Sequence, residues 1–318
     1  MKVLANDGIS QTGIDSLEAA GFEVTTNTLA QDELIEYINE TKIDVILVRS
    51  ATEVRKDIID SCPSLKIIGR GGVGMDNIDV EYARGKGLHV INTPAASSAS
   101  VAELVFAHLF GGVRYLYDAN RNMPLDGDSK FKDLKKNYAG GRELRGKTLG
   151  IIGIGRIGQE VAKIALGCGM KVIVSDKYIN KVTVKVEFFD GQFINVDLTS
   201  IPFEDLLKES DFISLHVPAQ KDYVIGRNEF ELMKDGAAIV NAARGGVINE
   251  VALIEAIENN KLSFAAIDTF ENEPNPAIKV LMNGKLSLTP HIGAATKEAQ
   301  DRIGTELADQ IKDILIKN

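Results

Sequence analysis

The chain has 318 residues, 44% of them hydrophobic and 25% charged, with a formal net charge of −9 at pH 7. These values are close to those of soluble globular proteins and the length suits two domains, so they argue against a disordered chain. The acidic balance, without any block rich in lysine and arginine, argues against a nucleic-acid partner.

Short runs rich in valine and isoleucine alternate with segments of helical periodicity, a pattern typical of parallel sheets covered by helices. The first series of expected strands is KVLA, FEVTT, DVILV, KIIGR and LHVIN. The second series is KTLGIIGIG, KVIVSD, DFISLHV, AAIVNAA, FAAIDTF and LSLTP. The sequence therefore predicts an α/β protein with two doubly wound parallel sheets.

A long apolar helix is expected between the two series, at residues 98–120. It is followed by the polar stretch RNMPLDGDSKFKDLKKN, which we interpret as an exposed excursion. The domain boundary is expected near this junction. After LTPHIGAAT the sequence becomes helical again, and since no further strand follows, this last helix is expected to return to the first domain.

One segment departs from the alternation of strands and helices. In KVTVKVEFFDGQFINVDLTS, residues 181–200, alternating side chains flank Asp190 and Gly191, and an Asp-Gly pair in this context is typical of a hairpin turn. The sequence therefore predicts a β-hairpin inserted after the strand that ends at Asp176.

A glycine-rich turn follows the first strand of the second series. Gly153, Gly155 and Gly158 form a GxGxxG pattern between a strand and a helix-like segment, the context that dinucleotide binding requires. Such a turn brings backbone N–H groups and a helix N-terminus against a pyrophosphate. Asp176, at the end of the next strand, would bind the adenosine ribose and repel a 2′-phosphate, which predicts NAD rather than NADP, although Lys177 weakens this preference. The alternative is a turn that merely packs helix on strand, with Asp176 at the surface.

Five further segments accompany this motif: IGRGGVGMDNID, VINTP, AAIVNAARGGVINE, AAIDTFENEP and LTPHIGAAT. Together they resemble the D-isomer-specific 2-hydroxyacid dehydrogenase family, in order and along nearly the whole chain. The resemblance implies a flavodoxin-like substrate-binding domain at residues 1–97, completed by a C-terminal helix at 293–318, and a Rossmann NAD domain at 98–292. The hairpin at 181–200 departs from the family pattern, and its role is left open.

Within the family, DVILVRSAT, IGRGGVGMDNID and HIGAATKEAQ are similar to the branch that oxidises 3-phospho-D-glycerate to 3-phosphohydroxypyruvate, the first step of phosphorylated serine biosynthesis. One alternative is a reductase of the hydroxypyruvate, glyoxylate or D-lactate type. An alternative from another class is an NAD-sensing binding protein similar to corepressors. The regulatory C-terminal domains of many such dehydrogenases are expected to be missing, because the chain ends soon after the last helix.

The resemblance implies a catalytic set of Arg244, Glu273 and His291. His291 would be the acid/base group, Glu273 would orient the imidazole and favour its protonated form, and Arg244 would hold the substrate carboxylate and the reacting oxygen. On sequence alone, a glutamate before a proline is usually a solvated loop residue, and the arginine could form a salt bridge.

The remaining histidines are given other roles. His89, in an expected strand, and His108, in the apolar helix, are expected to be structural. His216, at the end of a strand of the nucleotide domain, is expected to line the adenine side of the cofactor site.

The resemblance also implies two sets of ligand contacts. The expected cofactor contacts are Val73, Gly153, Gly155, Arg156, Ile157, Gly158, Asp176, Val217, Ala242, Ala243, Arg244, Asp268, His291, Gly293 and Ala294. The expected substrate contacts are Arg49, Ser50, Arg70, Val73, Gly74, Arg244 and His291. The loop from Arg70 to Gly74 would present N–H groups to the substrate carboxylate, while Arg49, Ser50 and Arg70 would bind a distal phosphate or, alternatively, form surface salt bridges.

Partners and compartment complete these expectations. The helix at 98–120 is more apolar than one buried face requires, and the resemblance implies a homodimer through it, with a wholly intramolecular core helix as the alternative. Cys62 and Cys168 lie in no metal-like or disulfide-like spacing, so we expect no metal site and a reducing compartment. No signal-peptide core or long apolar run is seen, which predicts a cytoplasmic protein without a membrane partner.

Overall fold

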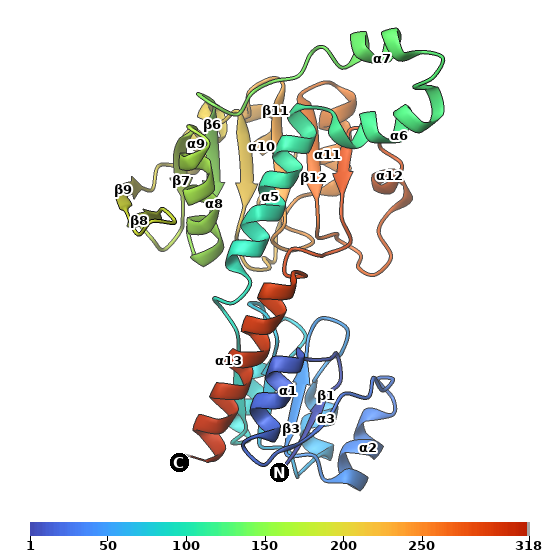
Figure 1. Cartoon of the computed structure of the whole chain (residues 1–318), viewed down its shortest axis with the longest axis vertical. Coiled ribbons are helices and arrows are strands. Elements are labelled where there is room, and N and C mark those ends of the chain that lie inside the picture. Colours follow the sequence, from blue (N-terminus) through green and yellow to red (C-terminus); the bar gives the residue numbers. More distant parts are fainter. Residues whose placement is uncertain (317–318) are drawn as a thin grey trace. The chain divides into compact units, whose positions relative to one another are not determined.

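The computed structural model describes residues 1–316. The chain forms two compact units, one made of Met1–Ser100 with the segment that begins at Ala294, and the other of Val101–Gly293. Each unit is built on its own parallel sheet covered by helices (Figure 1). The expected α/β architecture with two doubly wound sheets is therefore confirmed.

The sheet of the first unit contains the five strands that its valine- and isoleucine-rich runs predicted. They are β1 (Lys2–Ala5), β2 (Glu23–Thr25), β3 (Val45–Val48), β4 (Ile67–Arg70) and β5 (His89–Asn92). They lie in the order β2-β1-β3-β4-β5, and every neighbouring pair is parallel. This order is that of a flavodoxin-like sheet, in which ligands bind beyond the carboxyl ends of the strands.

Helices cover both faces of this sheet because successive strand residues point to opposite sides. Val3 packs with α1 (Gln11–Glu18) and α13 (Lys297–Leu315), which lie side by side in Figure 1. Leu4 packs on the opposite face with α2 (Leu34–Thr41) and α3 (Lys56–Ser61), and α4 (Val80–Gly85) adds Ala83 to the same cluster. The C-terminal helix thus belongs to the core of the first unit.

The second unit has a six-stranded parallel sheet, also at the predicted runs. Its strands are β6 (Thr148–Ile152), β7 (Lys171–Ser175), β10 (Phe212–Leu215), β11 (Ala237–Asn241), β12 (Leu262–Ile267) and β13 (Leu286–Leu288). The order is β13-β12-β11-β10-β6-β7, so the chain reverses direction across the sheet between β6 and β10. Such a reversal opens a crevice at the carboxyl ends of the strands, where dinucleotides bind in this class of fold.

The second sheet is likewise covered on both faces. One face packs against α5 (Ser98–Val113) and α8 (Arg156–Gly167). The other face packs against α9 (Phe203–Glu209), α10 (Arg227–Leu232), α11 (Glu250–Glu258) and α12 (Ile278–Leu281). None of the helices among the described residues combines the length and apolar character needed to cross a bilayer.

The predicted helix at 98–120 is wrong in its extent. The first helix, α5, ends at Val113, and Tyr115 has a left-handed backbone with φ 54°. A separate helix, α6 (Leu116–Asp126), and then α7 (Phe131–Asn137) form most of the polar stretch interpreted as an exposed excursion, and most of its residues are exposed. A single left-handed residue can end a helix without interrupting the apolar pattern, so the sequence did not reveal the break.

The predicted hairpin is confirmed. Its strands β8 (Lys181–Glu187) and β9 (Phe193–Thr199) pair antiparallel around the Asp-Gly turn. Val184 and Leu198 join the core on the α8 side of the sheet, and Ser200 forms a bridge with Val174 of β7. The hairpin therefore lies at the β7 edge of the sheet, next to the strand end that Asp176 follows.

Candidate active site

The three predicted catalytic residues follow neighbouring strands of the six-stranded sheet. Arg244 comes after β11, Glu273 after β12 and His291 after β13. Parallel strands end at the same edge of a sheet, so these three loops lie together in the second unit.

His291 and Glu273 form a direct contact. The imidazole Nδ1 lies 2.8 Å from Glu273 Oε2, and the backbone N–H of Phe270 donates to Glu273 Oε1 at 2.9 Å. Burial raises the pKa of the Glu273 carboxyl, but the hydrogen bonds from His291 and Phe270, with the charges of His291 and Arg244, outweigh it and hold that pKa below its usual value. Because Nδ1 is engaged by a carboxylate, Nε2 is the nitrogen placed to exchange a proton with a ligand.

The backbone of His291 is strained and is held by a buried aspartate. His291 has φ 54°, a left-handed conformation that costs about 1–3 kcal/mol for a residue other than glycine. Asp268, only 1% exposed, accepts hydrogen bonds from Ile292 N at 2.8 Å, Gly293 N at 2.9 Å and Thr289 Oγ1 at 2.6 Å. These bonds fix the loop on both sides of the imidazole, a role for Asp268 that the sequence did not indicate.

Arg244 lies in a tight turn fixed by Asn241. The Asn241 side chain donates to the carbonyl of Arg244 at 2.9 Å and accepts from Ala243 N at 3.1 Å. Gly245 brings this turn against the next loop so closely that a Cβ there would clash with the carbonyl of Phe270. The turn of Arg244 is thereby packed on the segment that leads to Glu273.

A cavity of about 600 Å³ lies at the carboxyl ends of β6 and β7 and contains the glycine-rich turn. Its lining includes five residues that the sequence analysis assigned to the nucleotide site: Gly153, Gly155, Asp176, His216 and Val217. Gly153 has φ 91°, and a Cβ there would lie 2.5 Å from the carbonyl oxygen of His216. Only glycine allows this close approach. The resulting turn leaves the N-terminus of α8 facing the cavity, an arrangement that fits a pyrophosphate.

The remaining predicted cofactor contacts of this unit lie near these two sites. They are Arg156, Ile157 and Gly158 in the first turn of α8, Ala242 and Ala243 after β11, and Gly293 after His291.

Asp176 has more partners than the sequence suggested. Its Oδ2 accepts from Ile154 N at 2.8 Å, and Oδ1 accepts from Tyr178 N at 2.8 Å and Ile179 N at 3.0 Å. A carboxylate has about four acceptor positions, so these bonds leave limited capacity for a ribose. Asp176 therefore also ties the glycine-rich turn to the segment after β7.

Of the other histidines in this unit, His108 is buried and His216 is half-buried, and each is hydrogen-bonded. His216 contacts Ser214 Oγ at 2.8 Å, and burial lowers its pKa to about 3. His108 contacts Ser287 Oγ at 2.8 Å and Thr289 Oγ1 at 3.1 Å, and burial likewise lowers its pKa. Both are therefore neutral at physiological pH, and His108 supports the threonine that donates to Asp268.

The predicted substrate residues of the first unit follow adjacent strands. Arg49 and Ser50 come after β3, while Arg70 ends β4 and leads into the loop with Val73 and Gly74. The Arg49 N–H donates to Asp7 Oδ2 at 2.6 Å, which fixes the backbone of this loop. Ala294, predicted to contact the cofactor, also lies in this unit, whereas Arg244 and His291 lie in the other.

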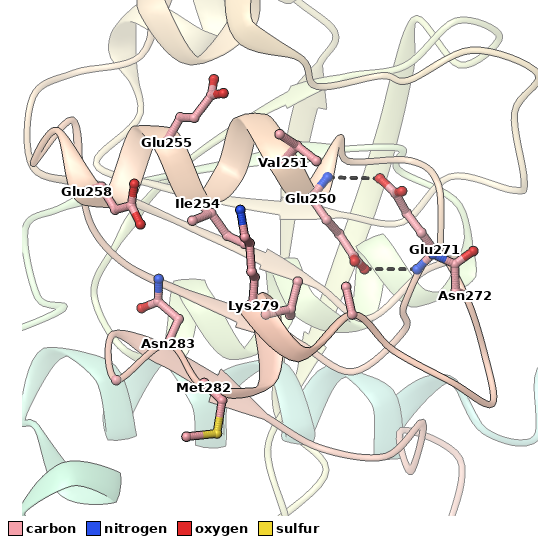
Figure 2. Close-up of a pocket in the computed structure, with 13 residues that line it drawn as sticks. Glu250, Val251, Ile254, Glu255, Glu258, Glu271, Asn272, Lys279, Met282 and Asn283 are labelled. Carbon is pink, nitrogen blue, oxygen red and sulfur yellow. Dashed lines mark hydrogen bonds between the residues drawn. The ribbon is translucent and has the colours of Figure 1, made fainter.

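A further cavity, of about 770 Å³, was not indicated by any sequence motif. Figure 2 shows that Glu250 and Glu271 face each other on its wall, which Lys279 and Met282 also line. Within residues 1–316, no group of three or more histidine, cysteine, aspartate or glutamate side chains is arranged to hold a metal ion.

Comparison with known proteins identifies related sequences and a matching family model. A family model described as D-isomer specific 2-hydroxyacid dehydrogenase, NAD binding domain, matches residues 106–293. The chain is 43% identical over 317 residues to a D-3-phosphoglycerate dehydrogenase of Methanocaldococcus jannaschii, covering 99% of this chain and 57% of that protein. It is 46% identical over 294 residues to a hydroxypyruvate reductase of Thermotoga maritima, covering 91% of this chain and 90% of that protein.

A solved structure is also similar over the whole fold. The D-lactate dehydrogenase of Aquifex aeolicus, complexed with NAD and lactic acid, is 29% identical with a TM-score of 0.75, over 99% of this chain and 95% of that one. The chain spans just over half the length of the D-3-phosphoglycerate dehydrogenases that it matches, 57% in one and 56% in another.

Proposed function

The chain belongs to the D-isomer specific 2-hydroxyacid dehydrogenase family, and we propose that it is an NAD-dependent oxidoreductase acting on a D-2-hydroxy acid. The observation that carries this proposal is the 2.8 Å contact between His291 Nδ1 and Glu273 Oε2 at the carboxyl edge of the second sheet. It supplies an oriented acid/base group at the carboxyl edge of the same sheet that carries the glycine-rich turn.

In the proposed mechanism, His291 Nε2 takes the proton of the substrate hydroxyl during oxidation and returns it during reduction. Glu273 stabilises the imidazolium that forms, because its carboxylate is held ionised within hydrogen-bond distance. Arg244 binds the substrate carboxylate and the reacting oxygen through its fixed charge. Bound NAD supplies the nicotinamide ring that accepts or donates the hydride.

The two units have different roles in this proposal. The second unit binds NAD through the cradle of Gly153 and Gly155, with Asp176 at the adenosine ribose. The first unit binds the substrate through the loops after β3 and β4. The other residues proposed to contact the cofactor are Val73, Arg156, Ile157, Gly158, Val217, Ala242, Ala243, Arg244, Asp268, His291, Gly293 and Ala294.

The proposed substrate is 3-phospho-D-glycerate. Arg49, Ser50 and Arg70 support it, because two arginines on adjacent strands suit a phosphate. A hydroxypyruvate reductase is the second candidate, favoured by the 46% identity to the protein of Thermotoga maritima. Steady-state kinetics on 2-hydroxy and 2-keto acids with and without a terminal phosphate test the choice. A higher kcat/KM for the phosphorylated substrate supports the first candidate, and a higher value for hydroxypyruvate or glyoxylate supports the second.

A homodimer is also proposed, through the surface of α5 and α6. Phe110 is 49%, Leu116 63% and Leu125 75% exposed, and large side chains of this kind favour an interface with a second copy. Light scattering on the purified chain tests the proposal: a dimer that becomes a monomer in Leu116→Lys supports it, and a wild-type monomer contradicts it.

The proposal also has a rival outside enzymes, an NAD-sensing corepressor-like protein. Measuring NAD reduction and NADH oxidation with the substrate panel separates the two functions. Turnover that depends on His291 supports the enzyme. Tight NAD binding without turnover of any substrate in the panel supports the sensor.

A further inference from the structure

Two glutamates on separate segments lie on the wall of the larger cavity, and the backbone N–H of each donates a hydrogen bond to the side-chain carboxylate of the other (Figure 2). Glu250 N donates to Glu271 Oε1 at 2.8 Å, and Glu271 N donates to Glu250 Oε1 at 2.9 Å. We call Glu250 and Glu271 the carboxylate clasp. It joins the first residue of α11 to the loop that follows β12.

The clasp costs more free energy than a purely structural contact would require. Glu250 is only 5% exposed; burial raises the pKa of its carboxyl, and the charges of Glu271 and Glu273 raise it further against the hydrogen bond from the Glu271 N–H. Burying one carboxylate beside another costs free energy that a pair of neutral side chains would avoid. Costly local arrangements of this kind are expected at functional sites.

The clasp holds the segment that presents Glu273. Glu271 precedes Glu273 by two residues, and the intervening turn is closed by the bond from Phe270 N to Glu273 Oε1 at 2.9 Å. On the other side of Phe270, its carbonyl packs against Gly245, next to Arg244. A shift of Glu271 would therefore move the carboxylate that orients His291.

We propose that Glu250 and Glu271 are positioning residues for the Glu273–His291 pair, acting through the backbone of residues 270–273. The inference rests on the proposed function. The clasp sets where the Glu273 carboxylate meets the imidazole.

The test compares variants that break the clasp with one that keeps its hydrogen bond. Glu250→Ala removes the acceptor of the Glu271 N–H and should lower kcat by about 10–100-fold, since misplacing a catalytic group by about 1 Å costs as much as 100-fold. Glu250→Gln keeps an acceptor oxygen and should retain kcat within about threefold, because one neutral hydrogen bond replaces a charged one. The dissociation constant of NADH, followed by its fluorescence, should be unchanged in both.

Two controls separate positioning from loss of stability. Glu258→Ala removes an exposed carboxylate of the same helix and cavity and should leave kcat unchanged. In a Glu273→Ala background, Glu250→Ala should have little further effect, because the group that the clasp positions is already gone. A general weakening of the fold would instead lower kcat equally in both backgrounds.

Glu271→Ala removes the other half of the clasp and gives the same comparison if Glu250→Ala does not fold. The proposal is overturned if folded Glu250→Ala or Glu271→Ala keeps wild-type kcat, if Glu250→Gln loses as much as Glu250→Ala, or if the loss persists without Glu273. An inactive wild type on the whole substrate panel would instead contradict the proposed function.

Discussion

Replacing Asp268 should release the loop that carries His291. Asp268 accepts hydrogen bonds from Ile292 N, Gly293 N and Thr289 Oγ1 while only 1% exposed. In Asp268→Asn one carboxylate oxygen becomes an NH₂ group, which cannot accept a bond, so one of the two backbone N–H groups loses its acceptor. A hydrogen bond to a charged group contributes about 1.5–3 kcal/mol. The left-handed backbone of His291 is then stabilised by fewer hydrogen bonds.

The loss can be measured locally by hydrogen exchange of the peptide that contains residues 289–294. Since 1.4 kcal/mol is about a tenfold change in an equilibrium, the exposed amide should exchange about 10–100-fold faster in Asp268→Asn. The kcat should fall with it, because the imidazole is no longer held in one position.

A matched control is Asp235→Asn, which removes a carboxylate that is 90% exposed and paired with Lys261 on the surface. Exposed ion pairs contribute about 0–1 kcal/mol, so exchange in the loop and kcat should both be unchanged. Wild-type exchange and wild-type kcat in Asp268→Asn would refute the reasoning that this carboxylate holds the loop.

Three further predictions concern the ligands and the pH. Changing Arg49 and Arg70 to alanine should raise KM for 3-phospho-D-glycerate far more than for D-lactate; equal effects would argue against a phosphate site. Asp176→Ala should lower the ratio of kcat/KM for NAD over NADP, and an unchanged ratio would mean that Asp176 does not face the ribose. Because the pKa of Glu273 is lowered in the folded state, its contribution to stability is present above about pH 4.5 and is lost as the pH falls through the folded pKa. Urea unfolding of wild type and Glu273→Gln should converge on acidification, and a constant difference would contradict this sign.

The strands were predictable because they are short apolar runs, most of them containing valine or isoleucine, separated by segments of helical periodicity. The hairpin was likewise predictable, because the Asp-Gly pair at residues 190 and 191 favours a tight turn between two strands. In both cases the residues that determine the local structure are within a few positions of each other in the chain, so the sequence pattern reveals them.

The missed features depend on residues far apart in the chain. Asp268 binds the N–H groups of Ile292 and Gly293, and Glu250 binds that of Glu271, through contacts that exist only once the strands are side by side. The end of α5 was missed for another reason: the left-handed Tyr115 leaves no mark on hydrophobic periodicity.

The proposed function depends most directly on His291, and replacing this residue by glutamine while measuring turnover and NAD binding tests it. The variant keeps a side chain of similar size but has no group that can transfer a proton near neutral pH. General acid–base catalysis contributes about 10²–10⁴-fold, so kcat should fall by that factor while the variant still binds NAD. A loss smaller than about tenfold would show that His291 is not the acid/base group, because it lies below the range of this catalysis.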